Sequence, residues 1–201
     1  EPVRFFVSAP EKTVFDSGTA GLGFPTSIIS PDGRRIAFTA RDTAGKVSLW
    51  VRPLDTLAAQ SLPGTDDAAL PFWSPDSRSL GFFADGKLKR IDAAGGPVQT
   101  LCDAPTGRGG TWNRDGVILF APSTTSPIYR VASAGGEPVA VTKLVAGQTG
   151  HRLPSFLPDG RHFLYFTSLT VFVGALDSEE SKSLLTADSG ARYSATGDLL
   201  F

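Results

Sequence analysis

A motif of two strands joined by an aspartate turn recurs four times along this chain, and a fifth copy begins near its end. The copies read SIISPDGRRIAF (27–38), PFWSPDSRSLGF (71–82), GTWNRDGVILF (110–120), PSFLPDGRHFLY (154–165) and YSATGDLLF (193–201). The turn aspartates, at positions 32, 76, 115 and 159, follow one another at intervals of 44, 39 and 44 residues. This period is typical of the four-stranded blade of a β-propeller.

Large apolar residues occupy matching positions in the copies. One set stands three residues before each turn aspartate, and at the equivalent place in the last copy: Ile29, Trp73, Trp112, Phe156 and Tyr193. A second set ends the second strand: Phe38, Phe82, Phe120, Tyr165 and Phe201, each preceded two residues earlier by another apolar residue. A spacing of two places side chains on one face of a strand. Because a single blade cannot bury such a face, neighbouring blades are predicted to stack on one another.

The rest of each repeat predicts a third and a fourth strand. Third strands are expected at 48–54, 87–91, 128–131 and 171–176, and outer strands at 60–62, 98–101, 139–144 and 183–185. No stretch has a helical period, so the fold class is all-β. The predicted division is a lead-in at 1–26, blades at 27–70, 71–109, 110–152 and 153–192, and the start of a fifth blade at 193–201.

This division predicts a fragment of a larger propeller. The four blades are expected to form an open arc with an exposed apolar face at each end. Arg4 to Ser8 is strand-like and could close a complete ring by pairing into the last blade.

Turn chemistry accounts for the recurring aspartates. Proline presets φ, aspartate hydrogen-bonds to nearby backbone, and glycine accepts the positive φ that ends a tight hairpin. The residues predicted to build these turns are Asp32, Gly33, Asp76, Asp115, Gly116, Asp159 and Gly160. Ser77 replaces the glycine of the second turn, and Arg114 replaces the proline of the third. An acidic ring that binds metal or substrate is the alternative, but turn formation explains every copy without a ligand.

Composition and motif searches exclude several classes of function. The net charge is −1 and the basic residues are scattered, so nucleic acid is not an expected partner. No apolar run approaches the roughly 18 residues that cross a bilayer, so this segment is not expected to insert into a membrane. Cys102, His151 and His162 lack zinc-site spacing, and no metal or cofactor is expected. Nucleophile-elbow and phosphate-binding motifs are absent, so no residue is predicted to be catalytic.

Candidate binding residues stand where the innermost strands start, because these starts line one mouth of a propeller's central channel. They are Arg108, His151, Arg152 and Arg192, and together they predict a cationic mouth suited to a carboxylate, a phosphate or an acidic peptide. The alternative is that they solvate loops or pair with nearby acidic residues, namely Asp66, Asp67, Asp103 and Asp188.

Several blocks carry a resemblance to a known family. LWVRPLD (49–55), WSPDSRSLGFFA (73–84) and PSFLPDGRHFLY (154–165) resemble the TolB-like, WD-repeat-like β-propeller repeats of bacteria. GRGGTWNRDGVILFAP (107–122) is similar to the propeller region that follows the kinase domain and membrane segment of many bacterial serine/threonine protein kinases. The fourth blade departs from the pattern of the other repeats, because the loop between its second and third strands, at 167–170, is short.

The resemblance implies a sensor or interaction module without activity of its own, outside the cytoplasmic membrane and attached to a kinase. Its expected partner is a protein, a peptide or a small anionic ligand. Similar repeats also occur in TolB itself, a periplasmic interaction protein, and in the propellers of prolyl-oligopeptidase-like hydrolases, where they gate substrate access. The family provides no agreed ligand residues that could be transferred to this chain.

Overall fold

The structure is a computed structural model that describes residues 7–16, 27–194 and 196–201, and every helix or strand within these ranges is a β-strand. The first sheet contains β1 (Thr13–Phe15), β2 (Ser27–Ile29), β3 (Arg35–Asp42), β4 (Val47–Pro53) and β5 (Gln60–Ser61). The second contains β6 (Ala69–Trp73), β7 (Ser79–Ala84), β8 (Lys87–Asp92) and β9 (Gln99–Asp103).

Two further sheets and a hairpin complete the chain. The third sheet contains β10 (Gly110–Trp112), β11 (Val117–Phe120), β12 (Tyr129–Ala132) and β13 (Val139–Ala140). The fourth contains β14 (Arg152–Phe156), β15 (His162–Thr167), β16 (Thr170–Ala175) and β17 (Ser178–Thr186), and the hairpin pairs β18 (Arg192–Tyr193) with β19 (Leu199–Leu200). All pairings are antiparallel and join strands that are neighbours within a repeat, apart from the added β1. The all-β propeller predicted from the repeats is confirmed.

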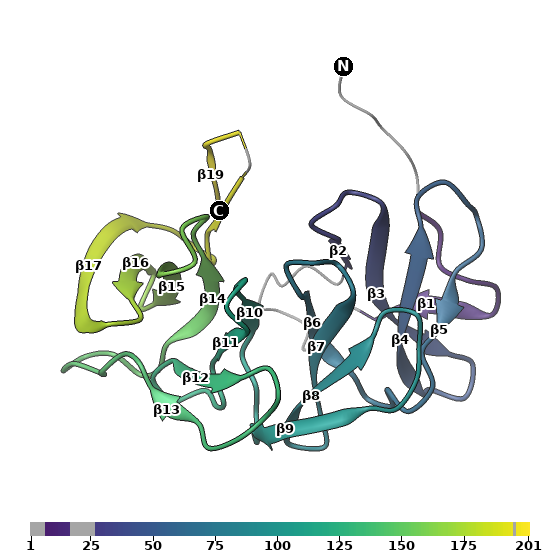
Figure 1. Ribbon diagram of the computed structural model, residues 1–201, viewed down its shortest axis with the longest axis horizontal. Helices are drawn as coiled ribbons and strands as arrows, with labels where there is room; N and C mark the ends of the chain where they lie inside the picture. The colour runs from purple at the N-terminus through teal and green to yellow at the C-terminus, as the bar shows by residue number, and fades with distance from the viewer. Residues whose placement is uncertain (1–6, 17–26, 195) are drawn as a thin grey trace.

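The blades follow one another in an arc. β6 packs against β2 and β3, β10 against β6 and β7, and β14 against β10 and β11. Figure 1 shows the outer strands β5, β9, β13 and β17 succeeding one another around the periphery, with an opening between the β18–β19 hairpin and the first blade. This arrangement fits a fragment of a larger propeller.

The core lies between the blades, as the apolar pattern predicts. Phe38, Phe82, Phe120 and Phe163, one from the second strand of each blade, are fully buried. Burial of each such ring contributes about 1.5–3 kcal/mol. The set before the turns is buried less evenly: Trp73 is 7% exposed, whereas Ile29 is 55% and Tyr193 is 43% exposed. Residues of that set therefore line open space as well as the interfaces between blades.

Both ends of the arc were predicted to expose an apolar face. At the first blade, Phe15 of β1 packs edge-to-face on Phe38 with ring centroids 5.2 Å apart, and Phe38 is fully buried. Val14 and Phe15 of β1 are themselves 62% and 37% exposed, so this end keeps exposed apolar side chains although Phe38 is covered. At the other end, Leu200 is 60% and Phe201 is 67% exposed. The closing role suggested for residues 4–8 lies largely outside the described residues, since only Val7 and Ser8 are described.

The innermost strands contain a repeated backbone irregularity. Leu70 and Leu153 have φ values of 50° and 55°, and each directly precedes a proline, where the chain ordinarily is extended. Gly109, with φ of 97°, holds the matching position of the third blade. The register of β6 and of β14 shifts at this point. In the fourth blade the irregularity turns the Leu153 N–H toward the preceding blade, where it donates to the Arg108 carbonyl at 2.9 Å.

Candidate functional site

Three turn aspartates are engaged within their own turns. Asp32 accepts hydrogen bonds from Ser30 Oγ (2.5 Å) and the Arg34 N–H (3.0 Å), and Asp76 accepts the same pair from Ser74 (2.6 Å) and Arg78 (3.0 Å). These bonds stabilise the charged form and lower the pKa of both carboxyls.

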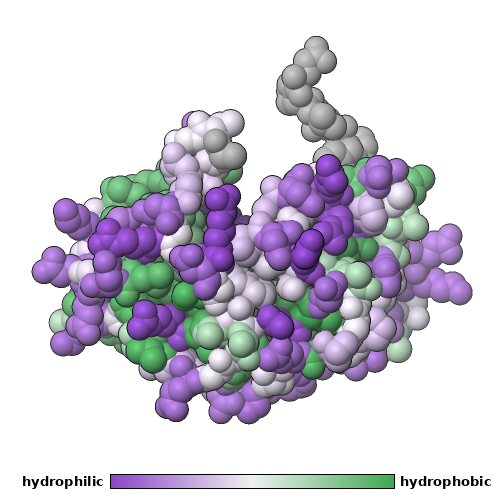
Figure 2. All heavy atoms as spheres, viewed as in Figure 1, coloured by the Kyte–Doolittle hydropathy of each residue, from purple (hydrophilic) through white to green (hydrophobic). Residues whose placement is uncertain are grey.

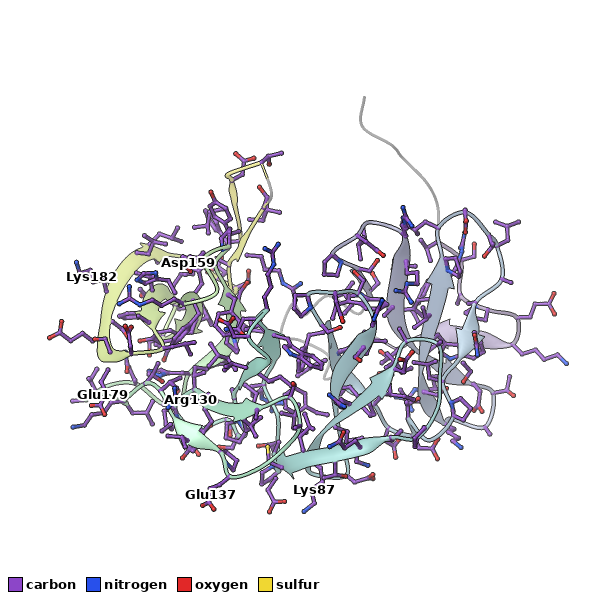
Figure 3. The ribbon with its side chains drawn as sticks, viewed as in Figure 1. Lys87, Arg130, Glu137, Asp159, Glu179 and Lys182 are labelled. Atoms are coloured by element: carbon purple, nitrogen blue, oxygen red, sulfur yellow. The ribbon has the colours of Figure 1, made fainter. Side chains whose placement is uncertain are left out.

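The fourth-blade turn, at the end of β14, uses its aspartate in a similar way. Asp159 (labelled in Figure 3) accepts the N–H groups of Arg161 (3.0 Å) and His162 (2.9 Å). His162 Nδ1 lies 2.5 Å from the same carboxylate, and this contact first, with the backbone bonds, lowers the pKa of Asp159 to about 2. The Asp159 carboxylate therefore accepts its hydrogen bonds from residues of its own turn.

The third turn is closed by a different residue. Asn113 Oδ1 accepts the N–H groups of Asp115 (3.1 Å) and Val117 (2.9 Å), while Asn113 Nδ2 donates to the Gly160 carbonyl of the next blade at 2.8 Å. The Asp115 carboxylate bonds to no other described residue. The prediction that Asp115 closes its turn is therefore corrected, since the amide of Asn113 fills the role that a carboxylate fills in the other turns.

Asn113→Ala is expected to destabilise the fold by about 2 kcal/mol, because Asn113 is 4% exposed and its loss leaves partly buried backbone groups of two blades without partners. Asp115→Ala, two residues away, should change stability by less than about 0.5 kcal/mol. Urea denaturation of the two variants checks this. Equal losses would mean that the Asp115 carboxylate has a role in the turn after all.

His151 does not contribute to a cationic mouth. The residue is 1% exposed, and its ring packs against Tyr165 at an interplanar angle of 41° with centroids 4.5 Å apart. Nδ1 lies 2.8 Å from Thr142 Oγ1, and Nε2 lies 2.9 Å from Gln148 Oε1. Burial lowers the pKa of His151 to about 4, so the ring is neutral at pH 7. Its predicted role in ligand binding is therefore corrected to a role in the core.

Arg108 and Arg152 stand at the strand starts, as the repeat predicts. Arg108 Nη1 donates to the Gly107 carbonyl at 3.3 Å, and the Arg152 guanidinium lies 5.7 Å from the centre of the Phe166 ring. Neither forms an ion pair with a described carboxylate. Two of the acidic residues considered as alternative partners are paired with lysines: Asp66 with Lys46 (2.9 Å) and Asp103 with Lys87 (2.5 Å).

Arg192 lies closer to its turn than Arg108 and Arg152 do. Arg192 lies in β18, and its pairing partner is Leu200 of β19. It stands two residues before its turn, the position that Thr111 and Ser155 hold in the third and fourth blades. Arg108 and Arg152 each lie five residues before the corresponding turn position. Arg192 nevertheless lines a cavity of about 60 Å³ together with Leu70, Gly109 and Leu153, which lie at or next to the starts of the inner strands.

A cavity of about 310 Å³ occupies the centre of the arc, and we call it the channel cavity. The inner strands β2, β6, β10 and β14 and the hairpin strand β18 all line it, and its charged lining consists of Arg114 and Arg192. Trp112 and Arg114 also line two adjoining grooves of about 420 and 520 Å³. Figure 2 shows the hollow in the surface between the β18–β19 hairpin and the first blades.

Sequence reasoning did not select Trp112 or Arg114 as binding residues. A signal was present at Arg114, which stands where the other repeats have Pro31, Pro75 and Pro158. In each of these copies, the residue at this position lines the channel cavity or one of the two adjoining grooves.

The remaining reactive side chains are poorly placed for catalysis. Burial, together with the nearby Asp103, raises the pKa of Cys102 to about 11, so its thiol is protonated at pH 7. His162 is held by Asp159, and no group of three or more His, Cys, Asp or Glu side chains within the described ranges could hold a metal ion. None of the described segments is a helix that could span a membrane.

Comparisons with solved structures define the fold. A protein from Agrobacterium tumefaciens described as TolB superimposes with a TM-score of 0.69 at 20% identity, over 87% of this chain and 71% of that one. The chain has the fold of a TolB-like β-propeller. No protein-family model matches its sequence, and neither does any curated protein.

Enzymes share the same fold. A puromycin-hydrolysing peptidase from Mycobacterium tuberculosis matches with a TM-score of 0.62 at 14% identity, over 84% of this TolB-like chain and 30% of the peptidase. Oligogalacturonate lyase from Vibrio parahaemolyticus matches with a TM-score of 0.61 at 12% identity, over 86% of this chain and 56% of the lyase. At such identities these matches describe architecture alone.

Proposed function

We propose that this TolB-like propeller is a binding module without catalytic activity of its own, and that its strand-start mouth takes an anionic ligand on Arg108 and Arg152. The observation that carries the proposal is the lack of an ion pair at either residue among the described parts of the chain, although both occupy the same position of successive repeats. Unpaired guanidinium groups form strong, charge-assisted hydrogen bonds with carboxylates and phosphates. An acidic segment of a protein, an acidic peptide or a small anion has this chemistry.

The state of the titratable groups favours binding over turnover. A nucleophilic mechanism needs a base within hydrogen-bond reach of an activated nucleophile. The Cys102 thiol is protonated, His151 is buried with both ring nitrogens engaged, and His162 is bound to Asp159. These arrangements support a role in recognition.

We further propose that the module senses a ligand for an attached signalling domain, outside the cytoplasmic membrane, in keeping with the kinase-associated repeats that residues 107–122 resemble. A second candidate is a propeller that gates substrate access to a hydrolase, and the fit to about a third of a peptidase favours it. The coding sequence on either side of this segment separates the two. An HRD kinase motif upstream supports the sensor, and a GxSxG motif downstream supports the hydrolase.

The binding proposal predicts that Arg108→Ala combined with Arg152→Ala weakens binding of a fluorescein-labelled hexaglutamate peptide about tenfold or more and flattens its salt dependence. Fluorescence anisotropy at several salt concentrations measures both. The control is Arg78→Ala combined with Arg130→Ala, which removes the same charge from exposed positions (Arg130 is labelled in Figure 3). If both double variants weaken peptide binding equally, the loss of affinity comes from the change in net charge, and this result would contradict the proposed mouth.

A further inference from the structure

The third turn breaks the repeat at a position that faces open space. Pro31 and Pro75 line the channel cavity at the turn position where the third copy carries Arg114. A proline there serves the turn by presetting φ. Arginine lacks that effect, and the Arg114 N–H donates no hydrogen bond within the described chain. The arginine is therefore not required by the turn, and its side chain adds charge to the cavity.

Arg192 brings a second cation to the same cavity from the last hairpin. It comes from β18, whereas Arg114 follows β10. Neither guanidinium forms an ion pair with a described residue, and no aspartate or glutamate lines the cavity. Neighbouring protein atoms partly desolvate the guanidinium and lower the pKa of Arg192, although the residue as a whole is exposed. Two cations without an ion-pair partner favour an anionic occupant.

The remaining lining is apolar or donates hydrogen bonds. Ile29, Pro31 and Trp112 form walls, and Ile29 is 55% exposed. The Thr111 hydroxyl accepts the Phe156 N–H at 3.3 Å, which leaves its proton free to donate. The Trp112 indole N–H has no acceptor in the described structure. This combination suits a molecule with a charged end and an apolar body, and the volume of about 310 Å³ is that of a small-molecule site.

We propose that the channel cavity binds a carboxylate attached to an apolar group, with Arg114 and Arg192 as its cationic partners and Trp112 as a wall for the apolar part. The inference goes beyond the proposed function, because it concerns the other end of the inner strands and different arginines. The carboxylate is either that of a free organic acid or the C-terminal carboxylate of a peptide.

Titration calorimetry with matched probes tests the proposal. N-acetylphenylalanine and a peptide ending in a free phenylalanine should bind, and their C-terminal amides should bind at least about tenfold more weakly, because only the charge is removed. Tighter binding of the peptide identifies a chain end as the natural ligand, and equal binding identifies a free acid. Amides that match the acids would overturn the proposal. So would inorganic phosphate that competes as well as the acids do, since the apolar part would then be irrelevant.

Variants assign the site to its residues. Arg114→Pro installs the residue of the other three turns, so folding should be retained while affinity falls about tenfold, and Arg192→Gln should have a similar effect. Arg108→Ala combined with Arg152→Ala should leave this affinity unchanged, which separates the result from a failure of the proposed mouth. Arg130→Gln, at an exposed site on β12, is the charge-matched control. Folded Arg114→Pro and Arg192→Gln proteins that bind like the parent would refute the assignment.

Discussion

Lowering the pH from 7 to 5 is expected to destabilise the folded chain by about 2 kcal/mol through His151 alone. Its pKa is lowered to about 4 by burial, whereas the unfolded chain has the ordinary value of 6.5. The folded state therefore binds fewer protons, and its stability is complete above pH 6.5 and is lost as the pH falls toward 4. The pKa values of Asp32, Asp76 and Asp159 are lowered, so their contribution is lost only below about pH 4.

The hydrogen bonds around His151 explain why the neutral ring is required. Thr142 Oγ1 accepts the Ile128 N–H at 2.9 Å, so its own proton is directed to Nδ1 of the histidine. Nε2–H in turn donates to Gln148 Oε1, which also accepts the Val145 N–H. A proton on Nδ1 would face the hydroxyl proton of Thr142 and break this chain of bonds.

Thermal unfolding at pH 7 and pH 5 measures the effect, and His151→Phe should remove most of the pH dependence while lowering stability at pH 7. His162→Asn is the control, because the side chain of that histidine is only partly buried and is bound to Asp159. If His151→Phe loses as much stability on acidification as the parent, the titrating group lies elsewhere.

Gly81→Ala is expected to destabilise the fold by about 3 kcal/mol, because the added methyl group has no room. A Cβ at this position would lie 2.2 Å from Phe72 Cζ. The same ring faces Gly110 of the next blade, where a Cβ would lie 2.4 Å from Phe72 Cε1. Phe72 is 5% exposed, so its ring is held between two glycines of adjacent blades and has no space to retreat.

Combining Gly81→Ala with Phe72→Leu should recover part of the loss, because the smaller side chain leaves space for the methyl group. Denaturant unfolding of both single variants and the double variant forms a complete cycle. Additive losses in the double variant would show that Phe72 and Gly81 do not constrain one another.

The repeats predict the blades because each carries its own turn and its own apolar strand. Less was predictable where pairing depends on distant segments or on polar strands. β1 was not foreseen, since it pairs with an extension of β3 as far as Asp42. β17 runs from Ser178 to Thr186, far beyond the expected 183–185. Most of its residues are exposed and its pairing with β16 is irregular, so alternation of apolar residues gave no signal there.

The candidate site was predictable in part for a similar reason. Counting residues back from the turns located Arg108 and Arg152, whose positions follow from the register. The repeat does not give Arg192 the same position as Arg108 and Arg152, and it does not show that His151 is buried. Whether a histidine faces solvent or core depends on its partners, here Thr142 and Gln148, which no spacing rule reveals.

The hydrogen bond from Leu153 to Arg108 gives a probe of motion between blades. Because this N–H is bonded across the boundary and not within its own sheet, it exchanges with deuterium only when the third and fourth blades separate. Amides of β15 that are bonded within the fourth sheet exchange only when that sheet itself opens. The ratio of the two exchange rates thus reports whether neighbouring blades separate before the sheet of any one blade unfolds.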